Sequence, residues 1–215
     1  MEIVVDNKHI FYDQLGLGSK DIVMLHGWGQ NMEMMRPLAI KLLNDKNIKN
    51  NYRITILDLP GFGASSEPDM DTDVFSYTKL IEDFLIALKI SKPIMLGHSF
   101  GGRLSIIYSS RNETEKVILF GAPCIREYKP TFKEKVLKGL KKIPFTKDLV
   151  ELAKQYIGST DYKNASPVMR RVLVNTINQD LSECAKKITA PTLLIWGSLD
   201  TAAPIEQARK LEKLL

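Results

Sequence analysis

The chain has 215 residues, 44% of them hydrophobic and 26% charged, and a formal net charge of +5 at pH 7. This length suits one domain with a full hydrophobic core, and the composition excludes an intrinsically disordered chain. No apolar run approaches the roughly 20 residues of a membrane span, and the first residues lack the pattern of a secretory signal, so we expect a cytoplasmic protein without a membrane span.

Short apolar runs typical of strands alternate along the chain with segments of helical spacing. The first two runs meet at Asp6-Asn7 and are predicted to form an antiparallel hairpin. Strands are predicted at residues 2–5, 9–16, 21–27, 53–61, 93–97, 116–121 and 191–197, and helices at residues 32–45, 75–90, 204–215 and from residue 99 onward. This alternation predicts an α/β fold, with a mostly parallel sheet and helices on both faces.

One block of the sequence departs from this alternation. Residues 125–188 are helical in pattern and free of strands, with helices predicted at residues 131–142, 147–158 and 166–181. Ser166 is the expected N-cap of the last helix, with Pro167 in its first turn. An insertion between two strand ends lies above the sheet. We therefore expect a helical lid at residues 125–188, and a core made of residues 1–124 and 189–215.

The same block carries the excess of positive charge. Residues 126–187 hold 14 of the 30 Lys and Arg residues but only 7 of the 25 Asp and Glu residues. These side chains are either solvated lysines on amphipathic helices or a surface that attracts an anionic substrate or an acidic carrier protein. No nucleic-acid-binding motif accompanies the charge, so nucleic acid is not an expected partner.

The segment Gly97-His98-Ser99-Phe100-Gly101 matches the pattern G-x-S-x-G where a predicted strand meets a predicted helix. In a nucleophile elbow this sharp turn presents a serine hydroxyl at a helix N-terminus, where backbone amides favour developing negative charge. Small neighbours are required because the two segments pass closely. Ser99 is therefore the candidate nucleophile, and a serine that only caps the helix is the alternative.

The segment His26-Gly27-Trp28-Gly29 ends another predicted strand. We expect the loop after His26 to direct the amide of Trp28 toward Ser99, so that the amides of Trp28 and Phe100 form an oxyanion hole. The His26 side chain itself is expected to make hydrogen bonds within the loop, and the Trp28 indole to wall the mouth of a pocket.

Two aspartates also follow predicted strands. Asp200 lies just beyond the last strand, where a carboxylate can orient a catalytic imidazole and stabilise its charged form, although an ordinary turn aspartate is the alternative. Asp58 occupies a similar position, but the Pro-Gly-Phe-Gly after it favours a structural turn.

The segments HGWG, DLPGFGASS, GHSFGG and WGSLDTAAP, in this order, resemble the α/β-hydrolase family over nearly the whole chain. The HGWG and DLPGFG pair is similar to carboxylesterases of the pimeloyl-ACP methyl ester type. The resemblance implies an eight-stranded sheet, a helical lid after the sixth strand and catalytic residues in the order Ser, Asp, His. It assigns Ser99 as nucleophile, Asp200 as the triad acid, and the Trp28 and Phe100 amides as the oxyanion hole.

A serine needs a base within hydrogen-bond reach, and none of the three histidines is expected to serve. His98 adjoins Ser99, but neighbouring side chains at such a bend point apart. His9 belongs to an early strand at the far edge of the sheet, and His26 to the oxyanion loop. By the resemblance, the base follows an eighth strand beyond the printed sequence.

Three explanations of this absence stay open. The sequence is a shortened form of a longer protein, or the protein has lost its base and kept the fold for binding, or another chain supplies the histidine. The first is favoured because the segment TLLIW would otherwise be an exposed apolar sheet edge, which is an aggregation hazard.

The sequence thus predicts a serine hydrolase of small carboxylic esters or thioesters, which is nearly inactive in this exact chain. A non-catalytic binding module on the same fold, an acyltransferase and a lyase are the alternatives. No metal or organic cofactor is expected. Cys124 and Cys184 lack metal-ligand spacing and are expected to be free thiols, with a single disulfide as the alternative.

Overall fold

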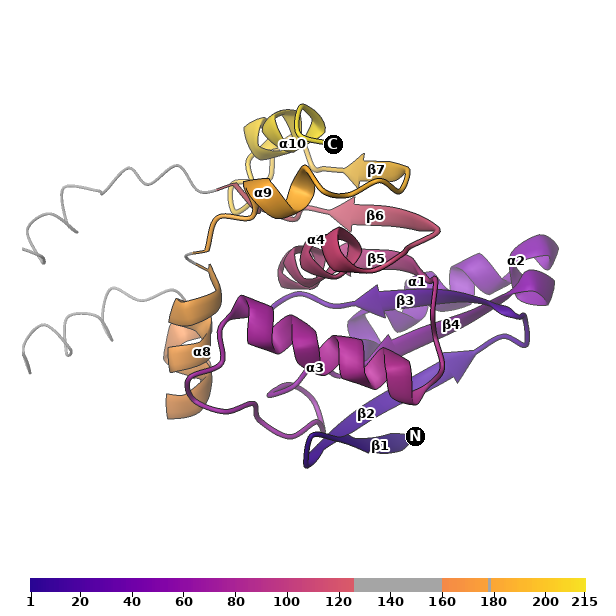
Figure 1. The fold of residues 1–215 in the computed structure, drawn as a ribbon, viewed down its shortest axis with the longest axis horizontal. Coiled ribbons are helices and arrows are strands. Elements are labelled where there is room, and N and C mark those ends of the chain that lie inside the picture. The colour runs from indigo at the N-terminus through magenta and orange to yellow at the C-terminus, as the bar shows by residue number, and fades with distance from the viewer. Residues whose placement is uncertain (126–159, 178) are drawn as a thin grey trace, which may run out of the picture.

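The computed structural model describes residues 1–125, 160–177 and 179–215. Seven strands of these residues form one sheet in the order β1-β2-β4-β3-β5-β6-β7 (Figure 1). The strands are β1 (Glu2–Val5), β2 (Lys8–Leu15), β3 (Lys20–Leu25), β4 (Tyr52–Leu57), β5 (Ile94–His98), β6 (Lys116–Phe120) and β7 (Thr192–Ile195). β2 pairs antiparallel with β1 and β4, and the four other neighbouring pairs are parallel, so the predicted sheet is confirmed.

The predicted hairpin at the start of the chain is also confirmed. Val5 pairs with Lys8, so the loop consists of Asp6 and Asn7 alone, with φ angles of 48° and 58°. A two-residue hairpin turn with positive φ at both positions matches the twist of the flanking strands, and Asp and Asn tolerate that backbone better than most residues.

Helices cover both faces of the sheet. Figure 1 shows α3 and α4 on one face with α9 beside them, and α1 and α2 on the other, while the arrows of β3, β6 and β7 point toward the end of the molecule where α8 lies. The described helices are η1 (Met32–Met34), α1 (Arg36–Leu43), α2 (Lys46–Asn51), α3 (Val74–Ala87), α4 (Phe100–Arg111), α7 (Thr160–Asn164), α8 (Pro167–Ile177), α9 (Ser182–Ala185) and α10 (Ile205–Glu212).

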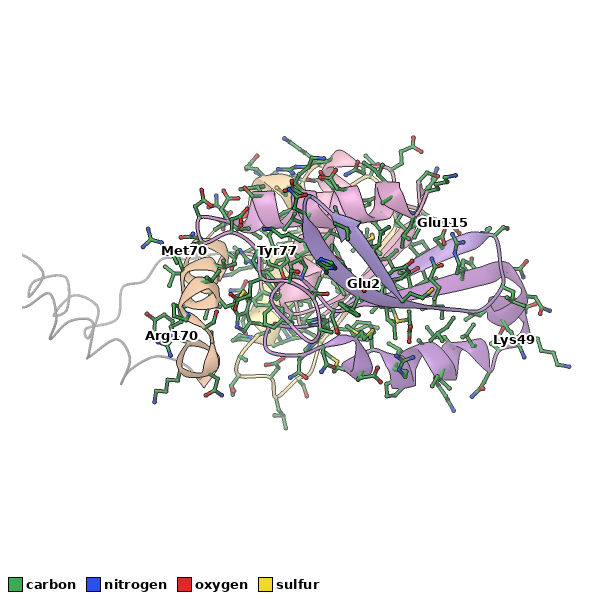
Figure 2. All side chains as sticks on the ribbon, turned by 90° about the horizontal axis from the view of Figure 1, so that it is seen from below. Glu2, Lys49, Met70, Tyr77, Glu115 and Arg170 are labelled. Atoms are coloured by element: carbon green, nitrogen blue, oxygen red, sulfur yellow. The ribbon has the colours of Figure 1, made fainter. Side chains whose placement is uncertain are left out.

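The strands of the sheet centre bury both faces, because successive side chains point to opposite sides. In β3, Val23 and Leu25 belong to the larger apolar cluster, which includes residues of α3, α4 and α8, whereas Ile22 and Met24 belong to the smaller cluster under α1. Figure 2 shows side chains filling the space between these layers, with the fully buried Tyr77 of α3 among them.

The helix predicted at residues 166–181 forms α8, and its expected cap is confirmed. The Ser166 hydroxyl accepts a hydrogen bond from the Met169 amide at 3.1 Å, and Pro167 is the first residue of the helix. The helix ends at Ile177, four residues earlier than predicted, and a short α9 follows. The helices predicted at residues 131–142 and 147–158 lie outside the described residues.

The short helix α2 was not predicted, because its sequence KNIKNN has no apolar stripe. Its N-terminus is held locally, since the Asp45 carboxylate accepts hydrogen bonds from the amides of Asn47 and Ile48. In the part of the chain that the structure describes, no helix has both the length and the apolar character to cross a bilayer.

β7 forms one edge of the sheet among the described residues. Leu193 is 54% exposed and Ile195 is 41% exposed. The segment TLLIW is therefore the exposed apolar edge that its sequence predicts.

Candidate functional site

Ser99 forms the turn between β5 and α4, at the carboxyl end of the sheet. Its backbone has φ 49° and ψ −108°, a strained conformation for a residue with a side chain. The half-buried serine holds this conformation because its amide donates to the carbonyl of Phe120, at 2.9 Å, while α4 begins at the next residue. Its side chain makes no capping hydrogen bond to α4, so the alternative of a serine that only caps the helix is wrong.

Glycines permit this turn. A Cβ on Gly97 would lie 2.5 Å from the backbone of Gly101 and Gly102, and a Cβ on Gly101 would lie 2.2 Å from the carbonyl oxygen of Leu25. Both distances are far below van der Waals contact, so any larger residue would force α4 away from β5 or β3. The spacing of the G-x-S-x-G pattern therefore has a direct steric cause.

The loop after β3 lies against the elbow. The Gly101 amide donates to the carbonyl of His26 at 3.1 Å, and a Cβ on Gly27 would lie 3.5 Å from the Cβ of Ser99. The rings of Trp28 and Phe100 meet edge to face, with centroids 5.1 Å apart. Within the described residues no group accepts a hydrogen bond from the amide of Trp28 or Phe100.

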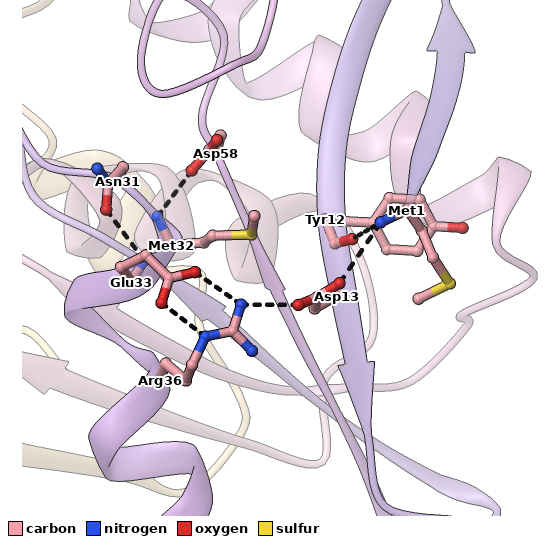
Figure 3. Close-up of polar contacts among 8 residues, drawn as sticks. All are labelled: Met1, Tyr12, Asp13, Asn31, Met32, Glu33, Arg36 and Asp58. Atoms are coloured by element: carbon pink, nitrogen blue, oxygen red, sulfur yellow. Dashed lines mark hydrogen bonds and ion pairs between the residues drawn. The ribbon is translucent and has the colours of Figure 1, made fainter.

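Polar contacts fix this loop from the other side (Figure 3). The buried Asp58 accepts the Met32 amide at 2.8 Å, and Arg36 donates to Glu33 and Asp13, each at 2.7 Å. The hydrogen bond from Arg36 is the main cause that holds the pKa of Asp13 below its ordinary value. The start of η1 and α1, which follow the Trp28 loop, is therefore tied to β2 and to the residue after β4.

Asp200 lies beyond the end of β7, at the same edge of the sheet. One of its carboxylate oxygens, Oδ1, accepts the amides of Ala202 and Ala203 at 2.9 and 2.8 Å. The other oxygen, Oδ2, faces the end of β6, where a Cβ on Gly121 would lie 3.3 Å from it, and no described residue donates to it. This half-buried carboxylate thus keeps one oxygen for a further donor.

His26 is a buried residue of the loop and has no free ring nitrogen. Its Nε2 accepts the Leu59 amide at 3.0 Å, and its Nδ1 donates to the Gly27 carbonyl at 2.7 Å. Burial lowers its pKa, which favours this neutral form. The expected loop hydrogen bonds are therefore present, and His26 cannot act as a base without breaking them.

His98 is half-buried, and its Nδ1 is enclosed without a hydrogen-bond partner among the described residues. A Cβ on Gly27 would lie 2.7 Å from this nitrogen, so the ring packs against the backbone of the loop after β3. Burial lowers the pKa of His98, and the charge of Asp200 acts in the opposite direction. The third histidine, His9, is exposed on β2 and pairs with Glu2.

A pocket of about 270 Å³ lies beside Trp28 and was not predicted from the sequence beyond the indole itself. Its lining combines the loops after β3 and β4 with the start of α8, namely Trp28, Gly29, Gly61, Phe62, Glu67, Asn164, Ala165, Ser166 and Met169. Met169 packs so closely that a Cβ on Gly61 would lie 2.3 Å from its sulfur. The apolar stripe of α8 predicts that the helix packs against another part of the molecule. It does not say which surface the helix covers, so the sequence did not reveal this contact.

The structure thus brings Ser99, Trp28 and Phe100 together and sets Asp200 at the same edge, two strands from Ser99. Both cysteines are free thiols. Among the described residues, no group of three His, Cys, Asp or Glu side chains could hold a metal ion.

Known proteins share this arrangement of strands and helices. A pimeloyl-[acyl-carrier protein] methyl ester esterase from Wigglesworthia glossinidia brevipalpis is 26% identical over 96% of this chain and 85% of its own length. The structure of an esterase from Exiguobacterium antarcticum matches with a TM-score of 0.73 and 24% identity, covering 100% of this chain and 87% of that one. A bromoperoxidase from Bacillus anthracis matches with a TM-score of 0.75 and 21% identity, covering 100% and 88%. The family model described as the alpha/beta hydrolase fold matches residues 21–150, and the chain belongs to this family.

Proposed function

We propose that the protein is a serine hydrolase that cleaves carboxylic esters, or thioesters, through an acyl-enzyme on Ser99. The observation that carries the proposal is the strained turn at Ser99, because a non-glycine residue with φ 49° persists only where the surrounding structure holds it. The amides of Trp28 and Phe100 are the proposed oxyanion donors. Relatives of this chain in the family support the proposed ester hydrolysis, since several of them are esterases.

The proposed reaction has two acyl-transfer steps. The Ser99 Oγ forms a bond to the carbonyl carbon, its proton passes to an imidazole, and the two amides stabilise the oxyanion. The carbon–oxygen bond to the alcohol then breaks, and the alcohol leaves with that proton. Water attacks the acyl-enzyme by the same path and releases the acid. The free Oδ2 of Asp200 is the proposed partner of the imidazole N–H, and stabilises its charged form.

None of the three histidines in the printed sequence has the surroundings expected of the base. Both nitrogens of His26 are bonded, His9 is on the antiparallel side of the sheet, and Nδ1 of His98 is enclosed against Gly27. We therefore propose that the base is a histidine outside the printed sequence, in a further segment or another chain. The 215-residue chain alone is expected to be about 10⁶-fold slower in kcat than the form that carries this histidine.

We further propose that α7 and α8 belong to a lid over the pocket beside Trp28, and that the acyl or alcohol group of the substrate enters this pocket. The relative from Wigglesworthia is named for an ester on an acyl carrier protein. The excess of Lys and Arg in residues 126–187 makes an anionic or carrier-bound substrate a proposal here as well. If so, replacing exposed Lys163 and Arg171 by Gln raises KM for acidic esters and leaves KM for neutral esters unchanged.

The test is a fluorophosphonate probe followed by identification of the labelled residue. We expect the histidine-bearing form to be labelled at Ser99, the 215-residue chain to react far more slowly, and Ser99→Ala to abolish labelling. Ser110→Ala is the matched control, because Ser110 lies at the far end of the same helix and, among the described residues, its hydroxyl donates to the Ile107 carbonyl.

Labelling at another residue, or none in the histidine-bearing form, overturns the proposal. Absence of labelling together with tight binding of an unreacted ester would instead favour a binding module on the same fold. Product analysis separates the remaining alternatives, because an acyltransferase passes the acyl group to an acceptor other than water.

A further inference from the structure

Arg103 is a buried cation that the proposed reaction does not use. It lies on α4, four residues after Ser99, and is only 5% exposed. Its own amide donates to the Ser99 carbonyl at 3.2 Å, so the two residues share the first turn of the helix. A cation at such a depth is costly unless its donors are satisfied, which raises the question of what the guanidinium binds.

The guanidinium binds backbone carbonyls at the neck of the lid, which we define as residues 123–124, 176–177 and 179–181. Nη1 donates to the carbonyl of Pro123 at 2.8 Å, just after the chain leaves β6. Nη2 donates to the carbonyls of Thr176 and Gln179 at 2.9 and 2.6 Å, where the chain returns. The two sides of the neck also meet directly, because the Leu181 amide donates to the Cys124 carbonyl at 2.9 Å.

The contact with the Thr176 carbonyl is also electrostatically favourable. It is one of the last carbonyls of α8, which have no partner within the helix and carry the negative end of the helix dipole. A guanidinium is the side chain best suited to bind several such acceptors at once, because its donors form a rigid planar fork. Arg103 therefore caps α8 at its C-terminus from within α4.

The other end of α8 lines the pocket. Ser166 and Met169 face Trp28 and Gly61 there, and Met169 is 3% exposed. An 11-residue helix is a rod of roughly 16 Å, so fixing its C-terminus restricts where its first turn lies.

We propose that Arg103 is a positioning residue, which fixes α8 over the pocket and thereby couples the shape of the pocket to the helix that begins at Ser99. The inference rests on the proposed function for the identity of the pocket as a substrate site. The contacts themselves do not depend on that function, and the experiment below is chosen accordingly.

The first measurement is amide hydrogen exchange of the intact chain, which needs no catalysis. In Arg103→Met we expect the amides of α8 to exchange at least about tenfold faster, while those of β3 and β5 keep their protection. Arg103→Lys keeps the charge but loses the planar fork of donors. The exchange rate of α8 in this variant should lie between the rates of the unmodified chain and of Arg103→Met. Arg111→Met is the matched control, because Arg111 is the exposed last residue of the same helix and contacts Glu82 and Phe75 instead of the neck.

The second measurement is the Kd of a non-hydrolysable 4-nitrophenyl alkyl ether, determined from the quenching of tryptophan fluorescence as the ether binds. We expect Kd to rise about tenfold in Arg103→Met and less in Arg103→Lys, with no change in Arg111→Met. In the histidine-bearing form the same variants should raise KM for long-chain esters more than they lower kcat, as expected when a binding wall moves and the nucleophile does not.

Two results would overturn the whole inference, and a third would overturn its coupling to the pocket. One is unchanged exchange of α8 with unchanged Kd, and the other is an equal loss of protection in α8 and the sheet, which would make Arg103 a residue of general stability. Loss of α8 protection with normal Kd would show that the helix is anchored by Arg103 but that the pocket is not the substrate site. That last result contradicts the coupling while leaving Ser99 labelling unaffected, so it is distinguishable from failure of the proposed function.

Discussion

Two pairs of histidine and aspartate lie at the carboxyl end of the sheet, and they differ in how their polar atoms are used. In the first pair, His26 and Asp58, every ring nitrogen and both carboxylate oxygens have backbone partners. In the second pair, His98 and Asp200, the enclosed Nδ1 and the Oδ2 have none among the described residues. The first pair therefore holds loops in place, whereas in the second pair Asp200 keeps one carboxylate oxygen without a described donor and His98 keeps an enclosed, unpartnered nitrogen.

The two carboxylates show the difference most sharply. In Asp58, each oxygen accepts one amide, that of Met32 or that of Ala64, both at 2.8 Å. In Asp200, a single oxygen accepts both amides. Replacement by asparagine, which keeps one oxygen and puts an NH₂ group in place of the other, should therefore disturb the two sites in opposite ways.

The largest expected effect is that of Asp200→Asn on catalysis. The asparagine oxygen keeps the bonds to Ala202 and Ala203, so the free energy of unfolding should change by less than about 0.5 kcal/mol. The NH₂ group cannot accept the imidazole N–H, and we expect kcat of the histidine-bearing form to fall about 10⁴-fold. Ester hydrolysis and urea unfolding of the same preparation measure the two quantities, and a loss of activity below tenfold would contradict the role of Asp200.

Asp58→Asn should show the reverse pattern. One amide, that of Met32 or Ala64, would face an NH₂ donor in a buried site, and we expect a loss of about 1–3 kcal/mol in the free energy of unfolding. Asp45→Asn is the control, because one Asp45 oxygen accepts both amides at the start of α2 and asparagine caps a helix equally well. Equal stability of the Asp58 and Asp45 variants in urea would show that Asp58 does not hold the loop.

The pH dependence of stability tests His26 in the same way. Burial lowers its pKa, so the unfolded chain binds more protons than the folded chain between the lowered pKa and the ordinary value of 6.5. The stability that the neutral ring contributes is therefore present above pH 6.5 and is lost as the pH falls toward the lowered pKa, by at most about 1.4 kcal/mol per pH unit. Urea unfolding at several pH values should show this slope, and His26→Gln should flatten it.

The sequence predicts the sheet and the elbow well because both depend on local patterns. Alternating apolar runs specify strands that bury both faces, and Gly97 and Gly101 lie where close approach of β5 and α4 excludes a Cβ. The hairpin at Asp6-Asn7 is local for the same reason. The motifs and the family resemblance name Ser99, Trp28 and Phe100 together, and the strands that precede them, β3 and β5, are neighbours in the sheet.

What the sequence does not reveal depends on contacts between distant segments or with the backbone. Arg103 binds three carbonyl groups, and any residue supplies a carbonyl, so no sequence pattern marks its partners. Nor does a sequence say which carboxylate oxygen accepts which amide, although this hydrogen-bond pattern is the difference between Asp58 and Asp200. The pocket wall at Met169 likewise joins α8 to a loop more than a hundred residues earlier in the chain.

The smallest expected effect is that of His98→Gln, and it decides whether the second pair is itself the catalytic one. Glutamine fills much of the space of the ring beside Gly27 but cannot accept a proton near neutral pH. If the base lies outside the printed sequence, kcat of the histidine-bearing form should fall less than about tenfold, whereas loss of a true base removes about 10⁶-fold. A loss of the larger size, measured with the same ester and with Ser99→Ala as the reference, would make His98 the base. The proposal of an external histidine would then be wrong.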